Sequence, residues 1–137
     1  MASTFSKEER AAMKAANAER KAAQEGAEAE AACDAAIDAM TGTDKELAEG
    51  FHQLVKENTS LAAKTWYGMP AYADADGKVV VAFKPALKFK TRYATLEFQH
   101  AAQLDDGSLW PVGFALTALG SAEKKRIAEI LKAAVGR

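Results

Sequence analysis

Hydrophobic residues recur along this chain with two different periods, which divide it into helices and strands. Between residues 44 and 58 the large apolar residues follow the spacing i, i+4, i+7 and i+8, namely Leu47, Phe51, Leu54 and Val55. This spacing predicts an amphipathic helix that faces a core, and Thr43 with Glu46 has the spacing of a capping box at its start. A last helix is predicted with Ser121 as its cap, and its apolar stripe consists of Ile127, Ile130, Leu131 and Ala134.

The region between these two helices changes to the alternating period of β-strands. An extended segment at 69–73 and the apolar run 79–83 flank Asp76-Gly77, which predicts a hairpin turn. Residues 93–99 alternate between two faces, and Asp105-Asp106-Gly107 predicts another turn before an extended segment at 109–114. This order of elements predicts an α+β fold, with helices on one face of an antiparallel sheet of about four to five strands.

The first 40 residues are rich in Ala, Glu, Lys and Arg. Ser6 and Glu9 form an S-x-x-E capping box, and the Ala-rich run that follows to about residue 24 has high helix propensity. Gly26 is expected to interrupt this helix, and a second helix is predicted at 27–40 with a stripe of Cys33, Ala36, Ile37 and Met40. We therefore expect a helical N-terminal extension over residues 1–40 and a domain over residues 41–137.

Composition is that of an ordinary globular domain, with 49% hydrophobic and 27% charged residues among 137. The net charge of −1 gives no global reason to expect binding to nucleic acid or to a membrane surface. The single cysteine, Cys33, excludes an intramolecular disulfide and a thiolate cluster for zinc, and its place on an apolar stripe predicts an inert buried thiol. No apolar segment suggests a signal peptide or a membrane span, so a cytoplasmic location is expected.

Residues 64–72, with the sequence KTWYGMPAY, carry a family resemblance. This stretch resembles the signature of the YdhG-like family, known as domain of unknown function 1801. The resemblance covers about residues 44–136. It continues through three further segments, which are GKVV at 77–80, KFKTRYATL at 88–96, and LDDG at 104–107 followed by Trp110-Pro111.

The resemblance implies a two-layer sandwich similar to frataxin. At least one relative is regarded as an iron chaperone that hands iron to cluster or haem assembly, so weakly bound iron and an iron-acceptor protein are the cargo and partner that the family suggests. Most members have no assigned activity, and the family has no agreed catalytic residues. The expectation is a non-enzymatic binding domain.

The aromatic stretch itself allows two interpretations. The first is packing, because aromatic side chains bury roughly 150–250 Å² each. The second is an aromatic groove that holds a small molecule or a peptide, and its hypothetical lining residues are Trp66, Tyr67, Met69, Pro70, Tyr72, Tyr93 and Trp110.

Glu30, Asp34 and Asp38 form an acidic ridge with i, i+4 and i+8 spacing. Carboxylates at this spacing repel one another, and a hard cation such as iron would offset the repulsion. The ridge is therefore the candidate metal site, against the simpler interpretation of a solvated helix surface.

The remaining chemistry-bearing residues are sparse. His52 and His100 are isolated in sequence and are expected at the surface or at the edge of the core. A basic stretch (Lys84, Lys88, Lys90 and Arg92) is interleaved with aromatic residues, but without a basic net charge we interpret it as a solvated strand edge. No phosphate-binding loop or nucleophile motif is present, so an enzyme with unrecognised chemistry is the least favoured alternative.

Overall fold

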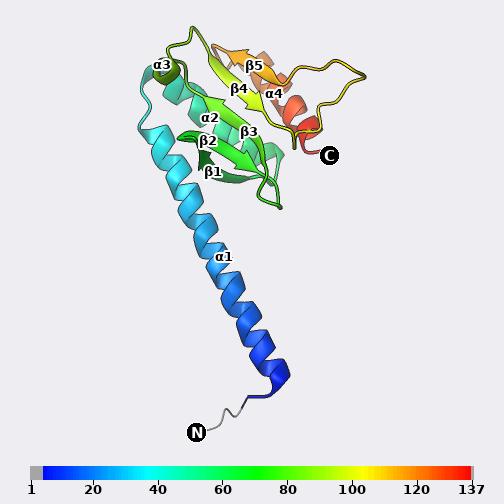
Figure 1. The fold of residues 1–137 in the computed structure, drawn as a ribbon. Coiled ribbons are helices and arrows are strands. Elements are labelled where there is room, and N and C mark those ends of the chain that lie inside the picture. Colours follow the sequence, from blue (N-terminus) through cyan, green and yellow to red (C-terminus); the bar gives the residue numbers. More distant parts are fainter. Residues whose placement is uncertain (1–4, 137) are drawn as a thin grey trace.

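A computed structural model describes residues 5–136 and shows an α+β fold (Figure 1). The elements follow the order α1 (Lys7–Asp38), α2 (Gly42–Asn58), β1 (Ala62–Trp66), β2 (Met69–Ala73), β3 (Val79–Lys84), α3 (Ala86–Phe89), β4 (Ala94–Phe98), β5 (Gly113–Leu116) and α4 (Ser121–Ala134). The strands form an antiparallel sheet in the order β1-β2-β3-β4-β5. The predicted fold class is confirmed.

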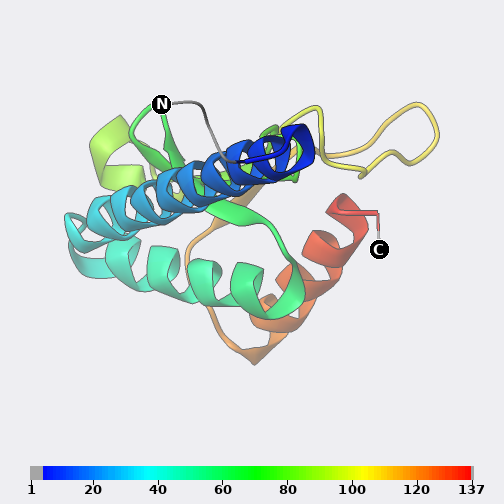
Figure 2. The ribbon, with the colours of Figure 1, turned by 90° about the horizontal axis from the view of Figure 1, so that it is seen from below.

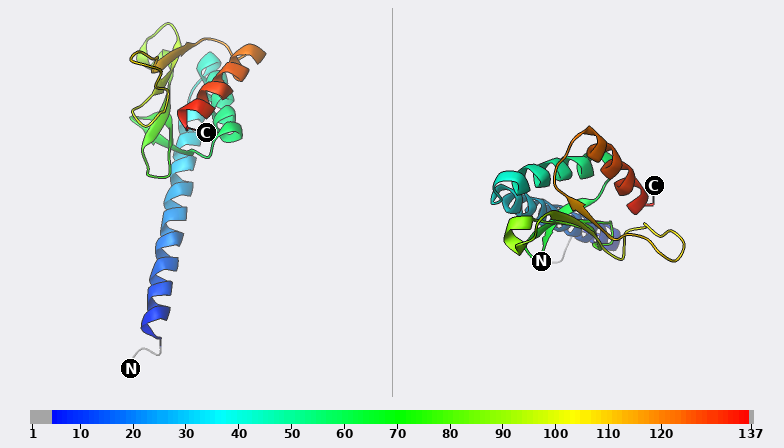
Figure 3. Two further views of the ribbon diagram at one scale, coloured as in Figure 1. Left: turned by 90° about the vertical axis from the view of Figure 1, so that its right-hand side faces the viewer. Right: turned by 90° about the horizontal axis from the view of Figure 1, so that it is seen from above.

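The helices cover one face of this sheet and leave the other face open. Figure 3 shows α2 and α4 on the same side of the sheet, and the C-terminal part of α1 packs against β1 and β2. One core cluster fills the space between the layers, and its large buried members include Phe51, Tyr72, Phe83, Leu96 and Leu131. On the open face, Met69, Ala71 and Ala82 form a small second cluster.

Helix α1 is continuous, so the interruption predicted at Gly26 is wrong. The capping box between Ser6 and Glu9 is confirmed, with Glu9 N donating to Ser6 Oγ at 3.1 Å. Gly26 costs only about 1 kcal/mol relative to Ala inside a helix, which its Ala-rich neighbours and the packed end of α1 outweigh. Figure 2 shows this C-terminal part of α1 lying beside α2.

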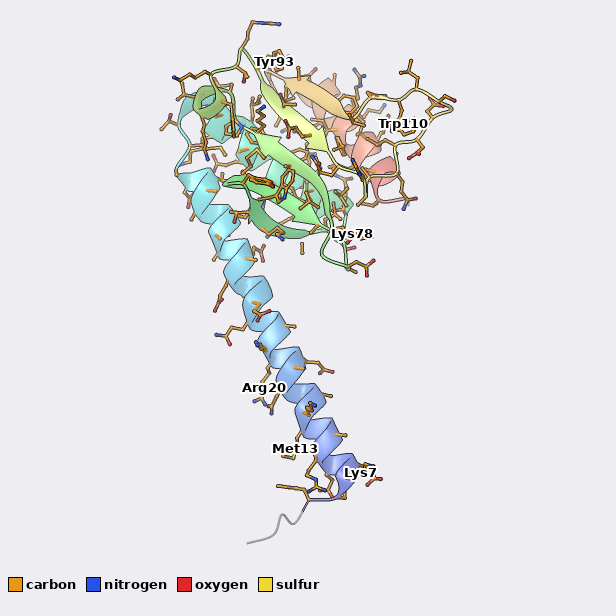
Figure 4. All side chains as sticks on the ribbon, in the orientation of Figure 1. Lys7, Met13, Arg20, Lys78, Tyr93 and Trp110 are labelled. Atoms are coloured by element: carbon orange, nitrogen blue, oxygen red, sulfur yellow. The ribbon has the colours of Figure 1, made fainter. Side chains whose placement is uncertain are left out.

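Most of α1 projects from the rest of the molecule. Residues 5–28 are all exposed, and Figure 4 shows Lys7, Met13 and Arg20 along the projecting part. Burial begins at residue 29, and Cys33 and Ile37 belong to the core cluster. The last turns of α1 are therefore part of the domain rather than of an extension that ends at residue 40.

The caps predicted for the other two helices are wrong. Helix α2 begins at Gly42, and its N-cap Thr41 makes no side-chain capping bond, so Thr43 and Glu46 lie inside the helix. Helix α4 begins at Ser121, and the cap is supplied from within the first turn, where Gly120 N donates to Glu123 Oε1 at 2.8 Å.

The hairpin predicted at Asp76-Gly77 is present and joins β2 to β3. The alternation predicted over residues 93–99 appears in β4, whose residues are alternately buried and half-buried. The predicted segment at 109–114 is displaced, since β5 begins only at Gly113 and residues 109–112 lie in a loop. Pro111 has no N–H for a sheet ladder, which is consistent with this displacement. None of the described helices is long and apolar enough to span a membrane.

Removing residues 1–25 is expected to lower the free energy of unfolding by less than about 1 kcal/mol, because the deleted helix buries almost no surface. Thermal unfolding followed by circular dichroism at 222 nm and by tryptophan fluorescence measures this. A matched deletion of residues 1–38 also removes Cys33 and Ile37 from the core and should abolish cooperative unfolding. Loss of cooperativity in the shorter deletion would contradict the division of α1 into a packed and a projecting part.

Candidate functional site at the hairpin end of the sheet

A two-residue turn at Tyr67-Gly68 joins β1 to β2, and the strand before it was not predicted from the sequence. In this hairpin Trp66 pairs with Met69, so Tyr67 and Gly68 are the only loop residues. Their φ angles are +51° and +75°, and positive φ at both positions is what a type I′ turn requires. The run of β-forming residues Thr65-Trp66-Tyr67 directly before Gly68 was the available signal for β1.

Tyr67 occupies this turn at a cost. A left-handed backbone conformation is unfavourable for an aromatic residue, by roughly 1–2 kcal/mol, whereas Asn or Gly would adopt it more readily. Burial of the ring offsets little of this unfavourable backbone free energy, because the Tyr67 side chain is 80% exposed. Strained residues of this kind concentrate at binding and catalytic sites.

Trp66 lies beside Tyr67 on the open face of the sheet. Its side chain is half-buried and packs against the cluster of Met69, Ala71 and Ala82. The rings of Trp66 and Tyr67 meet edge to face, with centroids 4.8 Å apart. The packing interpretation of the aromatic stretch thus describes Trp66 in part, and it does not describe Tyr67.

Helix α3 lies next to the hairpin turn and is held there by a residue that the sequence analysis did not single out. Asp44 of α2 is buried, and its carboxylate accepts hydrogen bonds from Ala86 N at 3.0 Å and Leu87 N at 2.9 Å. These bonds satisfy two backbone N–H groups at the start of α3 and fix its position. As a result Leu87 is 73% exposed and Phe89 is 38% exposed.

Two lysines complete this part of the surface. The Lys84 and Lys88 ammonium groups lie 5.0 Å and 5.7 Å from the centre of the Phe89 ring, within the range of cation–π attraction. Lys88 also approaches the turn, since a Cβ placed on Gly68 would meet its Nζ at 2.8 Å. We call the set formed by Trp66, Tyr67, Gly68, Leu87, Lys88 and Phe89 the hairpin end.

The residues proposed for an aromatic groove are distributed over several parts of the fold. Trp66, Tyr67 and Met69 lie at or beside the hairpin turn, and Tyr93 directly precedes β4 at the same end of the sheet. Pro70 and Tyr72 are fully buried, with Tyr72 in the core beneath the helices. Figure 4 shows Trp110 in the loop before β5, well away from Tyr93.

A polar cluster at the edge of the core joins α1, α2 and β2. The Tyr72 hydroxyl lies 2.9 Å from His52 Nδ1, and His52 Nε2 lies 3.7 Å from an Asp34 carboxylate oxygen. Burial, followed by the charge of Lys56, lowers the pKa of His52, and burial raises the pKa of the Tyr72 hydroxyl far above its usual value. The cluster therefore holds neutral His and Tyr side chains, and His52 lies at the edge of the core as expected.

Cys33 adjoins this cluster and is fully buried. Burial, the largest influence, raises the pKa of its thiol, although a hydrogen bond with Tyr72 acts in the opposite direction. The predicted burial of the thiol is confirmed, and a thiol without access to solvent is expected to be a poor nucleophile.

The three acids of the proposed metal ridge lie on the side of α1 next to α2 or at its end. Glu30 forms an ion pair with Lys56 at 2.7 Å, which lowers the pKa of its carboxyl, and Asp34 faces His52. Asp38 is the last residue of α1 and is exposed. Within residues 5–136 there is no group of three or more His, Cys, Asp or Glu side chains placed to hold a metal ion.

Comparison of the chain with protein-family models, with curated proteins and with solved structures finds no match. The resemblance to the YdhG-like family therefore stays a prediction based on residues 64–72 and the three segments that follow.

Replacing Tyr72 by Phe should lower the free energy of unfolding by about 1–2 kcal/mol, because the substitution leaves half-buried His52 and buried Cys33 without their hydroxyl partner. Urea denaturation measures this change. Tyr93→Phe is the matched control, since Tyr93 is half-buried outside this cluster, and its effect should stay within about 0.5 kcal/mol. Equal effects of the two substitutions would show that the polar cluster contributes nothing specific to stability.

Proposed function

We propose that this chain is a non-enzymatic binding domain that holds a peptide or a small molecule at the hairpin end. The observation that carries this proposal is the conformation of Tyr67, which combines a positive φ with 80% exposure of the side chain. Such a residue costs backbone energy and returns little burial, so selection for folding alone favours Asn or Gly in its place.

The composition of the hairpin end supports binding. Trp and Tyr offer large contact areas with few rotatable bonds, and they are the residues that most often dominate binding energy at interfaces. Leu87 adds an exposed aliphatic side chain to these rings. Grouped apolar side chains on the surface of a small domain are typical of sites that another molecule covers.

The non-enzymatic part of the proposal is supported by the positions of the His52, Tyr72 and Cys33 side chains. The polar cluster of Asp34, His52 and Tyr72 belongs to the layer between helices and sheet, whereas Trp66 packs on the open face. Tyr72 is 1% exposed and Cys33 is 0% exposed, so neither can meet a substrate without opening of the core. We assign this cluster to holding α1 against the domain.

Substitution of Tyr67 by Asn tests the proposal, with isotope-labelled protein titrated with a fragment library and with pools of random 12-residue peptides. In the unmodified protein, ligands should shift the amide resonances of the hairpin end. Tyr67→Asn should abolish these shifts and, by relieving the turn, raise the free energy of unfolding by about 0.5–1 kcal/mol. Leu109→Asn is the matched control, because Leu109 is 89% exposed in the loop before β5. Shifts that survive Tyr67→Asn, or that lie in the loop at 99–112, would contradict the proposal.

Iron is a second candidate ligand, and the resemblance to the YdhG-like family is its main support. Asp38 and Asp34 are exposed carboxylates one helical turn apart, which is the feature of the chain most compatible with weak binding of a hard cation. Glu30 is less suitable because Lys56 already neutralises it.

Anaerobic calorimetric titration with ferrous iron tests this candidate. The ridge proposal expects weak binding that is lost when Glu30, Asp34 and Asp38 are replaced together by Gln, Asn and Asn. A matched triple variant at the exposed residues Asp105, Asp106 and Glu129 should retain it. Undiminished affinity in the ridge variant would exclude the ridge, and no heat of binding in the unmodified protein would exclude iron as the cargo.

A further inference from the structure

The segments that build the hairpin end contain no acidic residue. Residues 59–73 and 79–96 hold five cations (Lys64, Lys84, Lys88, Lys90 and Arg92) and neither Asp nor Glu. The chain as a whole has a net charge of −1, so this positive charge is balanced by acids elsewhere, mainly on the helices. The surface around Tyr67 is therefore cationic in a protein that is nearly neutral.

Most of these cations are not neutralised within the described part of the chain. Lys84 is the exception, because its ammonium group lies 3.7 Å from a Glu97 carboxylate oxygen. Lys88 has no ion pair among residues 5–136, and its ammonium group lies over the face of Phe89 and close to the turn at Gly68. Asp44 lies near Lys88 but forms no ion pair with it among the described residues, and both of its oxygens accept bonds from the backbone of α3.

A cavity of about 290 Å³ opens beside Lys88. The turn between α1 and α2, the hairpin turn and the start of α3 enclose it, and its lining includes Met40, Thr41, Gly68, Pro85, Leu87 and Lys88. The lining is mainly apolar and has two charged side chains, Asp44 and Lys88. The Asp44 carboxylate accepts the backbone bonds at the start of α3, and among residues 5–136 the Lys88 ammonium group has no ion pair. A pocket of this kind suits a single large apolar side chain that has a negative charge close to it.

We infer that the ligand of the hairpin end is an acidic peptide that places one large apolar side chain in this cavity. The inference rests on the proposed function and specifies the class of partner. The apolar side chain contacts Met40, Pro85 and Leu87, while carboxylates next to it in the peptide meet Lys88 and the neighbouring cations. Complementary charge of this type gives specificity and speeds association, and the apolar anchor supplies most of the affinity.

The aromatic rings and cations of the hairpin end would also suit a single-stranded nucleic acid, but the geometry favours a peptide. Glu97 lies on the same open face as Lys84 and pairs with it, so Lys84 attracts any anionic ligand less strongly than an unpaired lysine would. Arg92 is placed over the ring of Tyr93, with its guanidinium 5.2 Å from the ring centre, which leaves that ring less available for stacking on a base. The apolar cavity and the exposed Leu87 have no role in contacts with phosphates or bases.

Selection from a display library of random 12-residue peptides, with the full chain as bait, tests the inference. The enriched peptides should carry several Asp or Glu residues around one large apolar residue. Their affinity, measured by fluorescence anisotropy, should fall at least tenfold with Lys88→Glu and should fall as salt is raised. Lys124→Glu is the matched control, since it reverses an exposed charge on α4, and it should leave the affinity within twofold.

The other outcomes separate this inference from the proposed function. Enrichment of neutral or basic peptides, or of acidic peptides insensitive to Lys88→Glu, would overturn the inference. If those peptides still lose affinity with Tyr67→Asn, the hairpin end remains the binding site and only the partner class is wrong. Tighter binding of a 12-residue oligothymidine than of any selected peptide, with the same dependence on Lys88, would replace the peptide by nucleic acid. A selection that yields no peptide bound at the hairpin end would overturn this inference, whereas the proposed function would then depend on the fragment titration alone.

Discussion

The ring of Phe51 meets the Tyr72 ring edge to face at 5.6 Å and lies 6.4 Å from the Phe83 ring, so it joins α2 to the two strands at the middle of the fold. Phe51 is fully buried, and the core cluster to which it belongs also contains Cys33 of α1 and Leu131 of α4. An antiparallel sheet that packs its helices on one face commonly leaves its other face to solvent. In this protein the second cluster, with Met69, Ala71 and Ala82 beneath Trp66, covers only part of that face.

The elements that could be predicted are those in which local pattern and packing agree. Helix α2 and strand β4 are amphipathic with a clear period, and their buried positions are those that the period indicates. The N-terminus of α1 was predictable because a capping box is a local device. The continuity of α1 through Gly26 was not predictable, because packing at one end of the helix and capping at the other outweigh the low helix propensity of a single Gly.

The candidate site was only partly predictable for a related physical reason. The sequence draws attention to aromatic residues at 64–72, but the faces on which they lie depend on strand β1 and on the positive φ angles of the turn. Asp44 looks in the sequence like an ordinary acid in the first turn of a helix. Its role depends on a contact with Ala86 and Leu87, more than 40 positions away, which no local pattern records. The same holds for the pairing of His52 with Tyr72, which required the packing of α2 on β2.

The hydrogen bonds from α3 to Asp44 also connect the hairpin end to the core energetically. Asp44 is in the first turn of α2, the helix that carries Phe51, and it holds the short helix that bears Leu87 and Lys88. A ligand that contacts α3 therefore binds a conformation that exists only while α2 is docked on the sheet. By mass action, ligand at one hundred times its dissociation constant would add about 2.7 kcal/mol to the free energy of unfolding. Thermal stability of the whole domain thus becomes a reporter of what binds at its surface.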